Sequence, residues 1–164
     1  MPKVCARIYN VMRGFDYSGQ YPGQYRQVFA EHLCVNLVRD NKNAFIHIDK
    51  NILDDWKISA VEAHDIAMKN LEAATVGQFA KGAAGIYFSQ WNDFYDSTRI
   101  LLTDRIRELK VAGNPVAIVP NDNTLAITGS DDNAGILELI GWIKTASDKY
   151  NFNCGYMFAL TEEG

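Results

Sequence analysis

Hydrophobic residues recur along the chain with two periods, and these periods predict where strands and helices lie. Short apolar or alternating runs between turn residues predict strands, and recurrence every three or four residues predicts helices. The runs that predict strands are residues 4–9, 33–39, 44–48, 85–90, 116–119, 124–128 and 154–160. Turn-forming residues at 40–43 and 120–123 join neighbouring runs, so each turn predicts a hairpin.

The first helix is predicted to follow Ser59. Ser59 and Glu62 have the spacing of a capping box, in which each side chain accepts a hydrogen bond from a backbone N–H of the other residue. One face is formed by Ala60, Ala63, Ala67, Leu71 and Ala74. This face is predicted to pack against a sheet.

Two further helices are predicted closer to the C-terminus. The second spans about residues 94–110, with Asn92 or Asp93 as its N-cap. The third spans about residues 132–150, and Ser130, Asp131 and Asp132 each offer an N-cap. Residues 13–27 and 77–85 are rich in glycine and polar or small residues, which is typical of loops and bends.

The predicted elements follow the order strands, helix, strand, helix, hairpin, helix, strand. This order indicates an α+β fold, a mainly antiparallel sheet with about three helices packed on it. No linker or repeat divides the chain, so residues 1–164 are expected to form a single domain. Residues 1–32 form a possible N-terminal extension.

Composition and charge narrow the function classes. The 164 residues are 48% hydrophobic and 22% charged, as in ordinary globular proteins, and the net charge is −4. The 16 basic residues are scattered along the sequence. Binding to nucleic acid or to an anionic membrane needs clustered lysines and arginines, so the sequence argues against both. The N-terminus lacks the apolar core of a signal peptide, and no run approaches a membrane span. We therefore expect a cytoplasmic protein with neither nucleic acid nor membrane as partner.

Motifs for cofactors, metals and nucleophiles do not occur in the sequence. There is no GxGxxG, phosphate loop, GxSxG or HExxH pattern. The three cysteines, Cys5, Cys34 and Cys154, lack metal-ligand spacing and lie in apolar segments, so buried thiols are expected. No cofactor, metal site or catalytic residue is predicted, and whether the protein is an enzyme stays open, with a non-enzyme favoured.

The region from about residue 33 to residue 160 resembles a known family. The helix start Tyr95-Asp96-Ser97-Thr98-Arg99-Ile100-Leu101, the strand Val116–Pro120 and the strand around Leu125-Ala126-Ile127 are similar to segments of the YtpQ-like family of uncharacterised bacterial proteins. The resemblance covers the C-terminal part of longer relatives. It implies the same fold plan and a bacterial or phage-related origin, and it implies no activity.

One candidate site is the predicted helix start at Trp91, Asp93, Tyr95, Asp96 and Arg99. Carboxylates beside an arginine can bind a ligand or a cation, or act as a base. The simpler interpretation is structural: Asp93 caps the helix, Asp96 favours the helix dipole, and Arg99 pairs with Asp96. The structural interpretation is preferred from the sequence.

A second candidate site is a segment rich in tyrosine and glycine, which contains Phe15, Tyr17, Tyr21 and Tyr25. Tyrosine offers a large contact area with a polar tip, and glycine lets the backbone adapt, as in recognition loops. The alternative is that these aromatic rings pack over the sheet.

Three functions from different classes follow. The favoured one is a non-catalytic protein-binding domain, of the immunity, anti-defence inhibitor or accessory-subunit type, that acts through the tyrosine-rich segment. The second is a small enzyme or ligand-binding domain that uses Asp93, Asp96 and Arg99. The third is a structural homo-oligomer.

Overall fold

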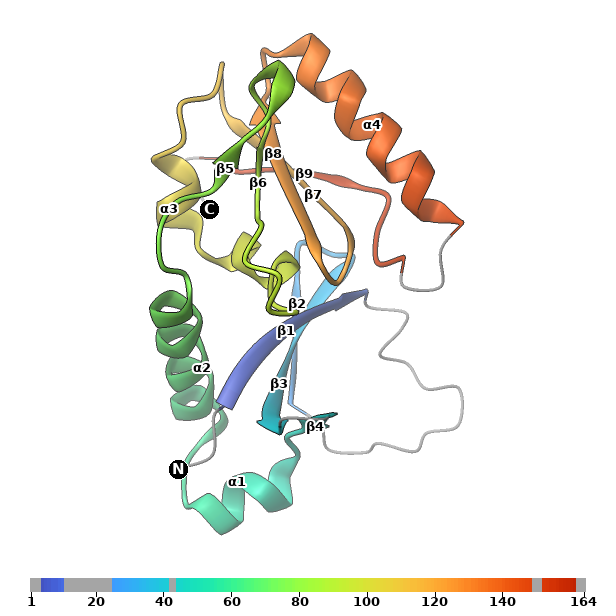
Figure 1. Cartoon of the computed structure of the whole chain (residues 1–164). Helices are drawn as coiled ribbons and strands as arrows, with labels where there is room; N and C mark the ends of the chain where they lie inside the picture. The colour runs from blue at the N-terminus through green and yellow to red at the C-terminus, as the bar shows by residue number, and fades with distance from the viewer. Residues whose placement is uncertain (1–3, 11–24, 42–43, 149–151, 162–164) are drawn as a thin grey trace. The chain divides into compact units, whose positions relative to one another are not determined.

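The computed structural model describes residues 4–10, 25–41, 44–148 and 152–161 (Figure 1). The chain divides into two compact units, Met1–Val76 and Gly77–Gly164. Strands pair antiparallel within each unit, and helices accompany both sheets, which confirms the predicted α+β class. The described strands form two sheets rather than the single sheet that the sequence predicted. A single domain stays a prediction.

The first unit contains a sheet built around one long strand. Its elements are β1 (Val4–Asn10), β2 (Arg26–Phe29), β3 (Leu33–Asn41), β4 (Ala44–His47), α1 (Lys50–Trp56) and α2 (Ala60–Ala74). β3 pairs with β1, β2 and β4. Helix α2 packs against β1 and β3 through the predicted apolar face, where Ala63, Ala67 and Leu71 are buried. The predicted capping box is present.

Two elements of the first unit differ from the sequence prediction. Residues 26 and 27 were assigned to a loop but belong to β2, which has no hydrophobic alternation and exists through its hydrogen bonds to β3. Helix α1 was not predicted. The residue that it buries is Leu53, and a single buried residue does not form the apolar stripe by which a helix is recognised in a sequence. The side chain of Asp49 caps α1 by accepting a hydrogen bond from the Ile52 backbone N–H at 2.9 Å.

The second unit contains a sheet with the strand order β5-β6-β8-β7-β9. Its strands are β5 (Ala80–Lys81), β6 (Tyr87–Phe88), β7 (Pro115–Asn121), β8 (Thr124–Gly129) and β9 (Met157–Ala159), with a short helix η1 (Ala83–Gly85) after β5. Helix α4 (Asn133–Ser147) packs on β7 and β8. Of the three residues predicted as possible caps, Asp132 is the one that caps α4, and it accepts a hydrogen bond from the Gly135 backbone N–H at 3.0 Å.

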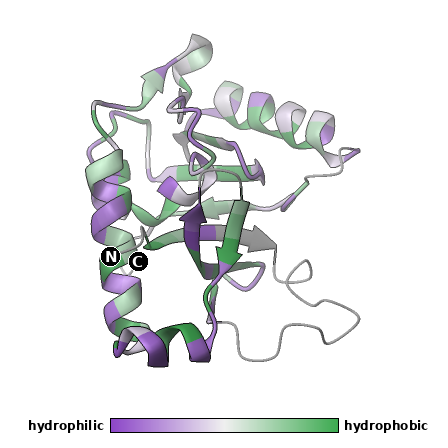
Figure 2. Cartoon of the chain, turned by 60° about the horizontal axis from the view of Figure 1, so that its bottom comes forward, coloured by the Kyte–Doolittle hydropathy of each residue, from purple (hydrophilic) through white to green (hydrophobic). Residues whose placement is uncertain are grey.

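The core of the second unit joins the sheet to α4. Ile86, Ile118, Ala126 and Leu139 pack together and are at most 2% exposed. Hydrophobic and hydrophilic residues alternate along the helices (Figure 2). In the part of the chain that the structure describes, every helix is too short or too polar to cross a membrane.

The predicted helix over residues 94–110 is wrong. The structure has a 3₁₀ helix, η2 (Ser97–Leu101), and a short α-helix, α3 (Thr103–Arg107), separated by Leu102, whose ψ is 61°. Residues 97–100 are four consecutive buried residues. Four successive buried residues do not form the single apolar stripe that the periodicity assumed, so the pattern of this segment does not predict its helix correctly.

Candidate functional site

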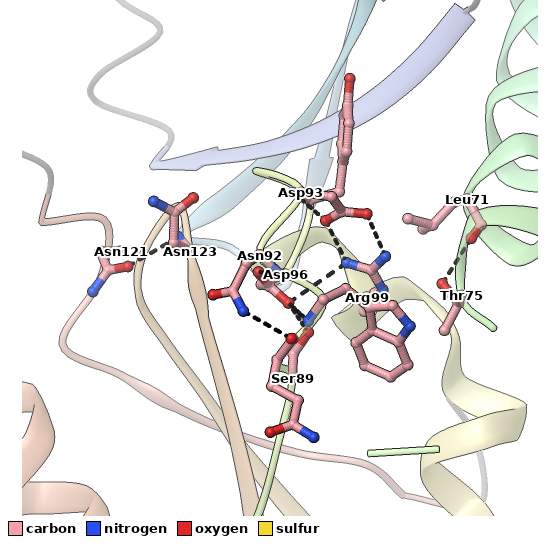
Figure 3. A network of polar contacts seen from close by, with 12 residues as sticks. Leu71, Thr75, Ser89, Asn92, Asp93, Asp96, Arg99, Asn121 and Asn123 are labelled. Carbon is pink, nitrogen blue, oxygen red and sulfur yellow. Dashed lines mark hydrogen bonds and ion pairs between the residues drawn. The ribbon is translucent and has the colours of Figure 1, made fainter. Parts of the chain in front are cut away.

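Arg99 is the centre of a buried polar network in the second unit, which we call the Arg99 cluster (Ser89, Trp91, Asp93, Asp96 and Arg99). The Arg99 side chain is fully buried. Its Nη1 and Nη2 donate to Oδ1 and Oδ2 of Asp93 at 2.8 and 2.6 Å (Figure 3). The guanidinium carbon lies 4.4 Å from the centroid of the Trp91 ring. A bidentate pair with a stacked aromatic is the arrangement that arginine is suited to make.

Asp96 closes the loop that precedes Arg99. Its carboxylate accepts hydrogen bonds from the Ser89 hydroxyl and from the backbone N–H groups of Trp91 and Asn92, the latter two at 3.0 Å each. The nearest Asp96 oxygen lies 3.6 Å from Nη1 of Arg99. Asp96 is 1% exposed, so these bonds replace the water that a buried carboxylate would otherwise need.

The loop held by these contacts contains two residues in the left-handed region. The φ angle of Asn92 is 54° and that of Phe94 is 65°. A bulky residue with this φ costs about 1–3 kcal/mol and persists only where its surroundings impose it. The Tyr95 backbone N–H also donates to Oδ1 of Asp93 at 3.0 Å. The Arg99 cluster therefore imposes the backbone conformation that positions Phe94.

Phe94 points outward from this loop with 58% of its surface exposed, whereas the next residue, Tyr95, is 5% exposed. In an unconstrained loop an aromatic side chain can turn toward the protein and bury its ring. Here the bonds of Asp93 and Asp96 fix the backbone on both sides of Phe94. The result is an aromatic ring presented to solvent on a rigid support.

The environment of Asp93 favours its charged form. Partial burial raises its pKa, but the hydrogen bonds from Arg99, the Tyr95 backbone N–H and the charge of Arg99 together lower it more. The pKa of Asp93 therefore lies below its usual value of 3.8. Asp93 is an ion-pair partner and, with its proton held so weakly, a poor general base near neutral pH.

The lowered pKa of Asp93 predicts a pH-dependent contribution to stability. A depressed pKa contributes stability above the unfolded value, and this contribution is lost as the pH falls through the folded pKa. We expect the difference in unfolding free energy between the wild type and Asp93→Asn to be constant above about pH 5 and to shrink below about pH 4. Denaturant unfolding at a series of pH values measures it, and a difference that persists unchanged into strong acid would contradict it.

The structure brings together four residues of the first predicted site and changes their roles. Asp93 does not cap a helix, because η2 begins at Ser97 and has no side-chain cap. Asp96 bonds the preceding loop rather than serving the helix dipole. Arg99 pairs with Asp96 at 3.6 Å, as predicted, and pairs more closely with Asp93, which was not predicted. Tyr95 is buried beside them. Ser89, which completes the cluster, was missed because no sequence spacing links it to Asp96.

The second predicted site is described in part. Phe15, Tyr17 and Tyr21 lie outside the described residues. The Tyr25 hydroxyl donates to Oε1 of Gln27 at 3.0 Å, and its ring centroid lies 6.4 Å from that of His64. Burial, followed by the charge of Asp65, raises the pKa of the Tyr25 phenol. Tyr25 is thus half-buried beside α2, and the role of the segment in recognition stays a prediction.

The chemistry of the Arg99 cluster is that of a structural ion-pair network. Both oxygens of Asp93 bond Arg99, and both oxygens of Asp96 bond N–H or O–H donors. Within residues 4–10, 25–41, 44–148 and 152–161, no group of three His, Cys, Asp or Glu side chains is placed to hold a metal ion. All three cysteines are buried thiols.

Comparison with known proteins gives distant bacterial relatives. The chain is 26% identical over 137 residues to a UPF0354 protein of Listeria monocytogenes serotype 4a and 25% identical over 137 residues to one of Listeria welshimeri. Each match covers 79% of this chain and 52% of the relative, so the chain spans about half the length of the curated relatives it matches. No family model and no solved structure matches. These relatives belong to an uncharacterised bacterial family, and the YtpQ-like assignment stays a prediction.

Proposed function

We propose that this chain is a non-catalytic protein-binding domain, of the immunity, inhibitor or accessory-subunit type. The observation that carries the proposal is the exposed side chain of Phe94, held on a left-handed backbone by the network around the fully buried Arg99. The network of contacts around Arg99 constrains a loop that carries an exposed aromatic side chain. A costly support beneath an exposed aromatic is typical of a recognition surface.

A loop that is already ordered in the free protein favours binding. Ordering a loop and its side chains on association costs free energy, and a loop already fixed in the folded protein avoids that cost. Aromatic side chains bury a large area and lose little rotamer entropy, so they are enriched among the residues that dominate binding energy. Phe94 combines both properties, because its backbone is fixed through Asp93 and Asp96 and its ring is exposed.

The test replaces Phe94 with asparagine. Asparagine tolerates the left-handed region, so Phe94→Asn removes the ring while the loop keeps its conformation. We expect the domain to stay as stable as the wild type, and the affinity for its partner to fall by roughly 30-fold or more, the loss typical of a residue central to an interface. The partner is captured with tagged protein in the native host, and its affinity is then measured by calorimetry with purified components.

Leu137→Asn provides the matched control, because Leu137 is 69% exposed on α4 and lies away from the Arg99 cluster in sequence. Unchanged affinity for Leu137→Asn together with a large loss for Phe94→Asn supports the proposal. Wild-type affinity in Phe94→Asn would remove Phe94 as the anchor. Recovery of further copies of the same chain, with no other protein, would indicate the homo-oligomer instead.

The tyrosine-rich segment is the second surface proposed for partner binding. Replacing Tyr17, Tyr21 and Tyr25 together with alanine is expected to weaken capture of the same partner. The segment lies in the first unit, whereas Phe94 lies in the second. Intact binding by the triple variant would leave Phe94 as the anchor and would reject the role of the segment.

A further inference from the structure

We propose that a second site, separate from the Arg99 cluster, binds a small aromatic anion. The site is a cavity of about 320 Å³ in the second unit, lined by the start of that unit, by β6, by α3 and by the residues that follow α3. We call it the α3 pocket. The residues that line it are Gly77, Gln78, Phe79, Tyr87, Arg105, Glu108, Leu109 and Lys110.

Aromatic rings form one part of the α3 pocket. Phe79 is 7% exposed and is held edge-on against the Trp91 ring, with centroids 5.4 Å apart and an interplanar angle of 86°. Tyr87 is half-buried, and its hydroxyl donates to the Lys110 carbonyl oxygen at 3.4 Å. These contacts fix both rings before any ligand arrives, so a planar ligand would meet preformed apolar surfaces.

Positive charge surrounds these rings. Arg105 and Lys110 line the pocket, and the Lys81 ammonium lies 5.0 Å from the centroid of the Tyr87 ring. The Arg105 guanidinium is oriented by its hydrogen bond to the Gly77 carbonyl oxygen at 3.2 Å. Glu108 is the acidic residue of the lining, so cationic side chains outnumber acidic ones at the pocket. An anionic ligand is favoured over a cationic one.

The Lys110 ammonium is available to a ligand. No hydrogen bond or ion pair joins the Lys110 side chain to another residue in the described part of the chain, and the residue is exposed. By contrast, the Lys50 ammonium is engaged by Asp54 at 2.7 Å. A lysine without a protein partner beside two fixed rings can donate to a carboxylate or phosphate without first breaking an internal bond.

The volume limits the size of the ligand. Small-molecule sites usually measure roughly 300–1,000 Å³, and the α3 pocket lies at the lower end of that range. It accommodates one ring system with an acidic group rather than a dinucleotide. The ligand class is therefore an aromatic or heteroaromatic carboxylate or phosphate, with its ring against Phe79 and Tyr87 and its acidic group near Lys110.

The test titrates the isotope-labelled full chain with phenyl phosphate and benzoate, followed by ¹H–¹⁵N correlation spectra. Inorganic phosphate and phenol serve as probes that carry only the charge or only the ring. We expect saturable shifts of the amide signals of Gln78, Phe79, Tyr87 and Lys110 with at least one of the two aromatic anions. Phosphate and phenol are each expected to bind at least roughly tenfold more weakly. Shifts that rise without saturation, or equal binding of phenol, would overturn the proposal.

Charge variants separate a specific site from general attraction. Lys110→Gln is expected to weaken phenyl phosphate binding roughly fivefold, because it removes a charge-assisted hydrogen bond. Glu108→Gln is expected to tighten binding roughly twofold, because it removes a repelling charge. Lys144→Gln, an exposed lysine on α4, is the matched control and should change nothing. Equal effects of Lys110→Gln and Lys144→Gln would show that net charge alone attracts the ligand and would reject the site.

Discussion

Replacing Arg99 with alanine is expected to destabilise the second unit by about 3–5 kcal/mol, the cost of breaking a buried ion pair by removing one partner. The Arg99 side chain is fully buried, and its loss leaves the buried carboxylate of Asp96 and the partly buried carboxylate of Asp93 without their cation. The stacking of the guanidinium on Trp91 is lost as well.

Hydrogen exchange of the β7 and β8 amides measures this loss of stability. It reports the unfolding free energy of the second unit even if the two units unfold separately. Arg107→Ala is the control, since Arg107 is paired with Asp104 at 3.5 Å on an exposed surface and should cost less than about 1 kcal/mol. Arg99→Lys is expected to restore only part of the loss, because lysine cannot form the bidentate pair. A cost for Arg99→Ala as small as that for Arg107→Ala would contradict a structural role of the cluster.

Replacing Leu139 with alanine is expected to destabilise the second unit by about 2–5 kcal/mol. Leu139 is 0% exposed and packs against Ile86, Ile118 and Ala126, so truncation removes buried apolar surface and leaves a cavity between α4 and the sheet. The spread of the expected cost reflects how far α4 can move to fill that cavity. Denaturant unfolding, with hydrogen exchange of the β7 and β8 amides to localise the effect, measures the loss.

Leu137 provides a matched control for this substitution on the same helix. It is the same residue type two positions earlier, but 69% of its surface is exposed. Leu137→Ala removes the same atoms from solvent-exposed surface and should change the stability by less than about 0.5 kcal/mol. Similar losses for the two variants would mean that α4 does not bury Leu139 as the structure shows.

For the candidate site, the sequence identified most of the residues that come together, but not the contacts that they make. Spacing alone placed Asp96 and Arg99 three residues apart on a helix, and therefore predicted their pairing. The segment forms a 3₁₀ turn instead, and the bidentate partner of Arg99 is Asp93, six residues earlier. A rule based on helical spacing cannot find a pair that depends on a loop folding back. The α3 pocket was missed for the same reason, because its lining comes from residues 77–79, 87, 105 and 108–110.

The sequence by itself determined most elements whose signal is local. The capping box at Ser59, the cap at Asp132 and the hairpin of β7 and β8 form as predicted, because each depends on residues a few positions apart. Helix α2 and helix α4 follow from apolar periodicity, since each buries one continuous stripe.

Only the tertiary structure decided features that depend on distant partners. Strand β2 exists through its pairing with β3, although its own residues show no strand pattern. The segment from Ser97 to Ile100 is entirely buried, and Arg99 within it is held by Asp93 and Trp91, so its 3₁₀ path accompanies contacts that apolar periodicity cannot show. The left-handed conformation of Phe94 likewise comes from the hydrogen bonds of Asp93 and Asp96. Local propensities differ by less than about 1 kcal/mol per residue, so burial and buried ion pairs override them wherever distant segments meet.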